Sequence, residues 1–446
     1  MSNLLQLKKG LDIPIKGAAA AQLLGSVKPG VIALKPTDIP GFSPRLLVKE
    51  GDRVLAGSPA MADKQRPELF LTSPVSGTVQ AIVRGEKRKL LAVLIQADAT
   101  QEKVDFGASA PKTAQEARDL LLKSGLWCAL IQRPYGRVAD PAIRPKSIFI
   151  SSFSTAPLAP DTEFTLADRL QDIQSGVKLL GLLTDGGVHL SIRKEVYSST
   201  PFHKVEGVIA HEVSGPHPAG NVGVQISHIS PIRKGETVWT IAPELVAAVG
   251  RLVNTGKLDL TRKIAVTGPA CEKPGYWEVL PGTPVSDIVK TGDGIRVIGG
   301  DVLTGETLGA DGYLGFFHQQ LTLLREGYDR EWFGWAKPFR PKVHSNSWCY
   351  FSWLTPGKKY DMDTNLHGGP RAFVQTKCFE DVTPMEIFPI YLIKACLAGD
   401  IEKMEKFGIY EVLPEDLALC DYVDPSKNEI QAIIQQGIDL MIKEMA

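Results

Sequence analysis

The chain lacks the cysteine patterns that mark disulfide frameworks and zinc sites. Its six cysteines are scattered over 446 residues, and none forms a C-x-x-C pair; they are Cys128, Cys271, Cys349, Cys378, Cys396 and Cys420. In a chain of this length, we interpret them as reduced thiols of a cytosolic protein that pack as small apolar side chains.

The chain also lacks an excess of charge and a long apolar run. It has 50 basic and 50 acidic residues, a balance that argues against a nucleic-acid binder and against attachment to a membrane through a polybasic patch. No apolar run approaches the roughly 18–20 residues of a membrane helix. Residues 1–30 do not show the pattern of a signal peptide.

Common catalytic and metal motifs are missing as well. There is no G-x-G-x-x-G dinucleotide fingerprint, no phosphate-binding lysine loop and no G-x-S-x-G nucleophile elbow. His211 and His217 do not have the spacing of zinc ligands. The stretch from Asp361 resembles an EF-hand loop, but Leu366 replaces the required glycine and Ala372 the bidentate glutamate. The chain therefore gives no sign of a self-contained catalyst.

What is present is a β-rich region over residues 31–100. Turns at Gly51-Asp52 and Gly57 separate short strands, and a second unit with Pro74 and Gly77 follows. These two units resemble the small β-barrel of biotinyl/lipoyl carriers. Carriers attach their group to a lysine in a tight hairpin, whereas Lys64 here has no flanking apolar pair, and we interpret it as a solvated surface lysine.

Helix and strand patterns alternate over residues 101–257. We expect helices at 114–122 and 164–183, and buried strands at 147–151 and 187–192. Alternation of this kind predicts a Rossmann-like three-layer α/β domain with a largely parallel sheet.

Residues 258–335 return to short strands around a short helix, with a hairpin turn expected at 291–294, which suggests a β-grasp domain. Beyond the aromatic-rich stretch from Trp332 to Trp353, residues 336–446 are predicted to be a helical domain. We expect one helix to open at Thr383-Pro384 and end at Gly399, the next to run from Asp400 to Gly408, and the last to open at Asp424-Pro425.

The order of these parts, after an N-terminal extension over residues 1–30, resembles the A subunit of the bacterial Na⁺-translocating NADH:quinone reductase. The resemblance covers nearly the whole chain. It is carried by LKKGLDIPI at 7–15, SGLW at 124–127, RPY at 133–135, GPHPAG at 215–220, HQQ at 318–320, LREG at 324–327, FGW at 333–335 and EDLALC at 415–420.

That family is related to the flavin subunit of respiratory complex I and the C subunit of the Rnf complex, and the relationship implies lost cofactors. Flavin-binding relatives hold the phosphate on a glycine-rich loop after the first helix of the α/β domain. Here bulky residues stand at 125–135. Of the relatives' iron–sulfur motif only Cys420 remains, with Asp424 at the last ligand position, so the C-terminal domain resembles a degenerate ferredoxin.

The resemblance implies a peripheral subunit on the cytoplasmic face of the inner membrane, docked on the adjacent integral subunit of a six-subunit complex. That complex uses NADH, flavins and iron–sulfur centres in other subunits to reduce ubiquinone and export Na⁺. This chain is expected to act near the quinone without a redox cofactor. A quinone needs aromatic walls and donors for its oxygens, which Trp127, Arg133, Tyr135 and Arg137 supply.

Three alternatives remain open. In the first, the four residues contact the quinone. In the second, they fill an abandoned flavin pocket, and the chain is then a purely structural adaptor of the complex. A flavin-dependent NADH dehydrogenase in its own right is the third possibility, and it predicts a yellow protein.

Overall fold

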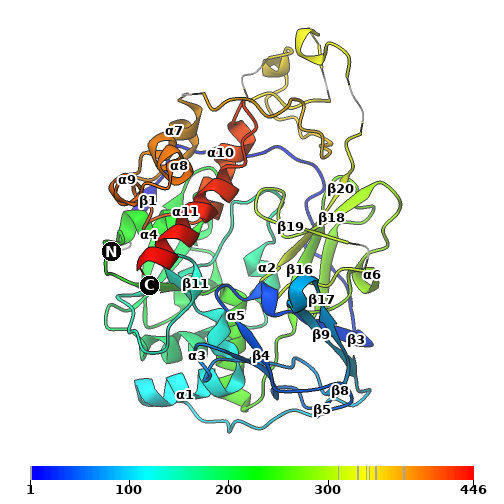
Figure 1. The fold of residues 1–446 in the computed structure, drawn as a ribbon, viewed down its shortest axis with the longest axis vertical. Helices are drawn as coiled ribbons and strands as arrows, with labels where there is room; N and C mark the ends of the chain where they lie inside the picture. The colour runs from blue at the N-terminus through cyan, green and yellow to red at the C-terminus, as the bar shows by residue number, and fades with distance from the viewer. Residues whose placement is uncertain are drawn as a thin grey trace.

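The structure is a computed structural model that describes residues 3–309, 311–328, 331–337, 339–340, 342–346, 349–374 and 377–445. It is a mixed α/β protein of several domains, each built around its own sheet or helical cluster (Figure 1). Within the described residues, no helix is both long enough and apolar enough to cross a membrane.

The N-terminal part of the chain is a barrel-like sandwich of two small sheets. The first sheet has the order β3 (Val31–Leu34), β9 (Leu90–Ala97), β8 (Gly77–Arg84) and β5 (Arg53–Val54); the second has β4 (Pro44–Leu46), β6 (Pro59–Asp63) and β7 (Phe70–Thr72). Ile32, Met61 and Ile95 are fully buried between them. A Cβ at Gly77 would lie 2.0 Å from the carbonyl oxygen of Gln96, so only glycine allows β8 and β9 to approach this closely.

A seven-stranded sheet forms the centre of the molecule, counted over the described residues. Its order is β1 (Asn3–Gln6), β14 (Val208–Ser214), β13 (Val188–Arg193), β12 (Ile148–Ser151), β15 (Val238–Thr240), β10 (Ile131–Arg133) and β11 (Arg137–Val138). The first five strands are parallel, and β10 and β11 run antiparallel to their neighbours. The expected strands at 147–151 and 187–192 are thus confirmed.

Helices cover both faces of this sheet. On one face, α3 (Leu170–Gly181) and α5 (Pro243–Thr255) pack with β12 and β13 side chains. On the other face, α4 (Val222–Ile229) packs Ile226 on Phe149. The helix expected at 114–122 is α1 (Ala114–Ser124), whereas the one expected at 164–183 is broken into α2 (Thr162–Leu166) and α3.

A six-stranded sheet follows, with the order β19 (Glu306–Leu308), β18 (Ile295–Gly299), β20 (Gln320–Arg325), β16 (Arg262–Thr267), β17 (Gly275–Val279) and β2 (Leu23–Ser26). The short helix α6 (Val285–Ile288) precedes β18. The hairpin expected at 291–294 is wrong: these residues join α6 to β18, which pairs with β19 and β20 instead.

Residues 3–26 connect the two large sheets. Strand β1 pairs in parallel with β14 at the edge of the seven-stranded sheet, and β2 pairs in parallel with β17 at the edge of the six-stranded sheet. The N-terminal extension therefore completes two sheets whose other strands come much later in the chain.

The C-terminal region is helical, with α7 (Cys378–Val382), α8 (Pro389–Ala398), α9 (Ile401–Phe407), α10 (Ala418–Val423) and α11 (Ile430–Met445). Short 3-10 helices lie at Gly334–Ala336, Ser352–Leu354 and Pro414–Leu417. The expected ends at Gly399 and Gly408 and the N-cap at Asp400 are confirmed.

Two expected helix starts are wrong. Thr383 is the C-cap of α7 and contacts the Cys420 sulfur, so it is not the N-cap of a helix, and α8 begins later with Pro389 in its first turn. Asp424 accepts hydrogen bonds from the backbone of Ser426 and Asn428 and so forms a local turn. The last helix opens at Ile430, whose N–H donates to Asp421.

Candidate functional site

The loop that follows α1 carries the four residues singled out from the sequence. Gly125 ends α1 in the left-handed conformation with φ 78°, and a Cβ there would lie 2.6 Å from the Thr72 hydroxyl. The chain then forms a buried 3-10 helix, Leu126–Ala129, before it enters β10. This loop therefore lies against both the N-terminal sandwich and the seven-stranded sheet.

Trp127 fills the interior of this loop. Its side chain is 1% exposed, its indole N–H donates to the Ala139 carbonyl at 2.8 Å, and its ring meets Trp239 edge to face at 5.4 Å. Both the apolar surface and the polar atom of Trp127 are thus satisfied by the protein.

Arg133 forms a buried link to the C-terminal region. It is 1% exposed and pairs with Asp416 at 2.7 Å and with Glu415 at 2.6 Å. Burial lowers the pKa of Arg133, but the two carboxylates outweigh it, and the pKa is raised overall. A Cβ on Gly223, at the start of α4, would lie 2.2 Å from the guanidinium. Only glycine at position 223 therefore leaves room for the Arg133 side chain beside α4.

Tyr135 and Arg137 are only partly buried. Tyr135 packs against Tyr410 with ring centroids 6.2 Å apart, and Tyr410 donates to Glu405. Burial raises the pKa of Tyr135. Arg137 lies over Gly41, where an added Cβ would come within 2.8 Å of its Nε atom. Each of the four candidates thus has a different neighbour, and the two partly exposed ones are the more accessible to a ligand.

Sequence reasoning missed a buried ionisable cluster between α5 and the six-stranded sheet. Gln319 donates to Glu244 at 2.6 Å, and Arg262 donates to the carbonyl oxygens of Gly315 and Phe316. Burial raises the pKa of Glu244 to about 7 and lowers the pKa of Arg262 to about 10. The sequence gives no sign that Glu244 is buried, because a glutamate in the first turn of a helix usually lies on the surface.

A cavity of about 1070 Å³ lies where the N-terminal extension, the six-stranded sheet and α10 meet residues 331–367. Ile13, Ile298 and Leu324 give it an apolar wall. His344 lies on its border, 2.7 Å from the Tyr422 hydroxyl. This volume is slightly above the roughly 300–1,000 Å³ of typical ligand pockets. No motif pointed to it, because its lining comes from four distant parts of the sequence.

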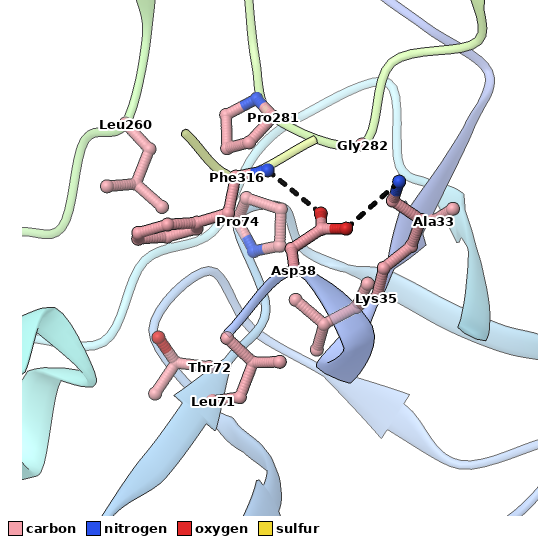
Figure 2. A pocket seen from close by; sticks show the side chains of 11 residues that line it. Ala33, Lys35, Asp38, Leu71, Thr72, Pro74, Leu260, Pro281, Gly282 and Phe316 are labelled. Carbon is pink, nitrogen blue, oxygen red and sulfur yellow. Dashed lines mark hydrogen bonds and ion pairs between the residues drawn. The ribbon is translucent and has the colours of Figure 1, made fainter. Parts of the chain in front are cut away.

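A much smaller cavity, of about 20 Å³, lies between the N-terminal sandwich and the six-stranded sheet (Figure 2). Asp38 accepts from the Phe316 N–H at 2.9 Å and pairs with Lys35 at 3.0 Å. A water needs roughly 10–15 Å³ of such space. This cavity therefore has room for about one water and excludes a quinone ring.

The other residues considered from the sequence are not gathered into a metal site. Within the described part of the chain, no group of three or more His, Cys, Asp or Glu side chains is arranged to hold a metal ion. Cys420 is buried, and burial raises the pKa of its thiol to about 12. Lys64 is exposed, as expected. His211 contacts His189 at 2.9 Å, whereas His217 contacts Thr155.

Three family models match the chain in succession. Residues 5–98 match the "NqrA N-terminal barrel-sandwich hybrid domain", residues 112–258 the "NqrA second alpha/beta domain", and residues 263–309 the "NQRA C-terminal domain".

Curated relatives are similar over nearly their whole length. Proteins named as the A subunit of the Na⁺-translocating NADH-quinone reductase, from Rhodopirellula baltica, Yersinia pestis and Neisseria meningitidis, are 37%, 36% and 35% identical. The matches cover 98%, 97% and 99% of this chain and 98%, 98% and 100% of the relatives, respectively. Among solved structures, a NAD⁺-reducing [NiFe]-hydrogenase in the H₂-reduced state matches at 12% identity and a TM-score of 0.38, over 74% of this chain and 61% of that one.

Proposed function

Because this chain belongs to the family of the A subunits of Na⁺-translocating NADH-quinone reductases, we propose that it acts beside the quinone, without a redox cofactor of its own. It is one part of an oxidoreductase complex rather than a separate enzyme. The proposed quinone is ubiquinone, reduced with electrons from NADH while Na⁺ is exported.

The proposed partners are the other members of a six-subunit complex, above all the adjacent integral membrane subunit. NADH, the flavins and the iron–sulfur centres are proposed to be held by those partners. The chain is proposed to lie on the cytoplasmic face of the inner membrane. This arrangement is supported by the family membership, and it fits a chain in whose described residues no helix is suited to cross a membrane.

We also infer the finer domain types. The parallel strands β14, β13, β12 and β15 follow the order 3-2-1-4 of doubly wound sheets, which supports a Rossmann-like domain at 101–257. Strands β17, β16, β20, β18 and β19 have the order 2-1-5-3-4 around α6, which supports a β-grasp domain at 258–335. The proposed boundaries leave a lipoyl-like barrel at 31–100 and a helical, degenerate ferredoxin-like domain at 336–446.

The proposed quinone contacts lie in the loop after α1. The observation that carries this proposal is the division within the loop between buried and accessible groups. Tyr135 and Arg137 are partly exposed and can donate to a quinone oxygen. Trp127 and Arg133 are buried, and their contacts with the protein fix the conformation of the loop. Donors matter most when the carbonyl oxygens gain negative charge on reduction.

A purely structural role is the second candidate. This role is supported by the contacts of Trp127 and Arg133. Their polar groups bind other residues of the protein and so are not available to a ligand. The third alternative, a flavin-dependent dehydrogenase, predicts flavin absorption in the purified chain, and an absorbance spectrum tests it directly.

A ubiquinone titration of the chain alone and of the assembled complex tests the proposal. We expect Tyr135→Phe and Arg137→Gln each to weaken binding of the neutral quinone by up to roughly tenfold, the value of one hydrogen bond to a carbonyl oxygen. Arg144→Gln, an exposed arginine paired with Asp185, is the matched control. A His344→Ala variant tests the large cavity as the alternative location. If Tyr135→Phe and Arg137→Gln both bind like the wild type, the loop is not the quinone site.

A further inference from the structure

The segment 332–360, called the aromatic segment below, is not explained by the proposed function. Nine of its 29 residues are Trp, Phe or Tyr, against 7% in the whole chain, and four of the seven tryptophans lie in it. Figure 1 shows the described part of it as yellow loops at the top of the molecule, with little regular structure.

Most of its large apolar side chains are exposed in the described residues, although Tyr360 is buried and Trp332 and Phe339 also line the large cavity described above. Trp332 is 82% exposed, Phe339 61% and Trp353 59%; Phe333, Phe351 and Leu354 are exposed as well. Single exposed apolar residues are common on proteins, but a gathering of this kind marks a surface that binds something.

The charges of the aromatic segment have one sign. It contains no aspartate or glutamate and five basic residues, which are Lys337, Arg340, Lys342, Lys358 and Lys359. Glu331, just before the segment, pairs with Lys337 and Arg340. Lys342 and Lys359 are exposed and pair with no acidic group among the described residues. The balanced charge of the whole chain argued against a polybasic patch, but this segment has a local excess of positive charge that it can offer to a negatively charged surface.

We propose that the aromatic segment binds the surface of an anionic phospholipid bilayer, with the exposed side chains of Trp332, Phe339 and Trp353 in the headgroup layer. Tryptophan is enriched at the membrane–water interface, and each nearby lysine gains from anionic lipid. Protein interfaces, in contrast, favour arginine and are depleted of lysine. Four lysines to one arginine therefore favour lipid over a protein partner.

The irregular backbone limits how deeply the aromatic segment can enter the bilayer. Only the short 3-10 helices Gly334–Ala336 and Ser352–Leu354 occur in its described part. Unpaired backbone groups need water, so side chains enter the headgroup layer while the backbone stays at its surface. This inference goes beyond the proposed function, which requires contact with a membrane subunit but none with lipid.

Flotation of the full-length chain with vesicles tests the proposal. We expect binding to vesicles of phosphatidylcholine with about 30% phosphatidylglycerol, weaker binding to pure phosphatidylcholine, and a loss of binding with rising salt. Lys342→Glu combined with Lys359→Glu is expected to weaken binding by about thirtyfold or more. Binding is expected to shift the tryptophan fluorescence of the wild-type chain to the blue. Trp332→Ser combined with Trp353→Ser is expected to weaken binding more than the lysine variant does and to reduce that blue shift.

Matched controls lie on the N-terminal sandwich. Lys87→Glu with Lys89→Glu makes the same charge change at exposed sites, and Leu91→Ser removes an exposed apolar side chain. Both controls are expected to bind like the wild type. The proposal is overturned if the wild-type chain does not float with anionic vesicles, or if segment and control variants bind alike. It is also overturned if the segment variants lose only assembly with the rest of the complex, which would assign the surface to a protein partner.

Discussion

The loop after α1 and the aromatic segment are built from the same kinds of residues and use them in opposite ways. In the loop, Trp127 and Arg133 are each 1% exposed, and their contacts are with the protein itself. In the aromatic segment, Trp332 and Trp353 project into solvent. An aromatic and basic composition therefore predicts binding only where the fold leaves those side chains unsatisfied.

The largest expected loss of stability is in the buried loop after α1. Arg133→Met leaves the Asp416 carboxylate buried without its charged partner, and we expect the free energy of unfolding to fall by about 3–5 kcal/mol. Urea unfolding measures this loss. The double variant Arg133→Met/Asp416→Asn should recover part of it, and Arg144→Met should change it by less than about 0.5 kcal/mol. A single variant as stable as the wild type would contradict the buried link.

Tryptophan substitution compares the two regions directly. Trp127→Ala leaves a cavity and an unpaired Ala139 carbonyl, and we expect a loss of about 3–5 kcal/mol. Trp332→Ala, at an 82% exposed side chain, is expected to change stability by less than about 0.5 kcal/mol. Equal losses at the two positions would remove the distinction between the regions.

A smaller effect concerns Glu244, whose pKa is raised to about 7 by burial. The folded protein then holds this proton more tightly than the unfolded chain, so stability should fall as pH rises from about 4.5 to 7. Glu244→Gln keeps the acceptor for Gln319 and should remove that slope, worth roughly 1–3 kcal/mol. Unfolding curves at about pH 5, 6, 7 and 8 measure it. An unchanged slope in Glu244→Gln would assign the pH dependence to other groups.

The reactivity of the cysteines allows the two regions to be compared in the wild-type chain, without a substitution that changes stability. Cys128, in the buried loop, and Cys420 have thiol pKa values raised to about 12, and both are buried. Cys349, in the aromatic segment, is exposed, so the expectation that all six cysteines are packed in the interior is wrong for this residue. A thiol reagent at about pH 8 should label Cys349 in the native chain and reach the other two only after denaturation. Early labelling of Cys128, located by peptide mass, would contradict the packing of the loop.

Much of the fold follows from local patterns in the sequence. Gly399 and Gly408 end helices because their left-handed conformation favours glycine, and Asp400 caps α9 through its carboxylate. Local patterns fail where the expected N-cap residue contacts a residue elsewhere in the chain, or where such a residue supplies the cap. Thr383 turns to Cys420, and Asp421 of α10 supplies the acceptor at the start of α11. Neither contact has a signal in the neighbouring sequence.

The four candidate residues can be chosen from the sequence, and their role stays a prediction, but their contacts could not be predicted. The sequence identifies Arg133 as a possible donor, yet its partners Glu415 and Asp416 lie more than 280 residues later. The Glu244 cluster depends in the same way on Gln319, which lies directly before β20 and 75 residues later in the chain. Burial of a charge is decided by tertiary packing, which single-residue chemistry does not reveal.

The two strands of the N-terminal extension also set a schedule for synthesis. Strand β1 leaves the ribosome about 200 residues before β14, its partner, which at about 5–20 residues per second is a wait of about 10–40 seconds. Strand β2 waits still longer for β17. The first segment to be made therefore waits for its partners: β1 cannot pair until about half of the chain has been translated, and β2 cannot pair until about three fifths has been translated.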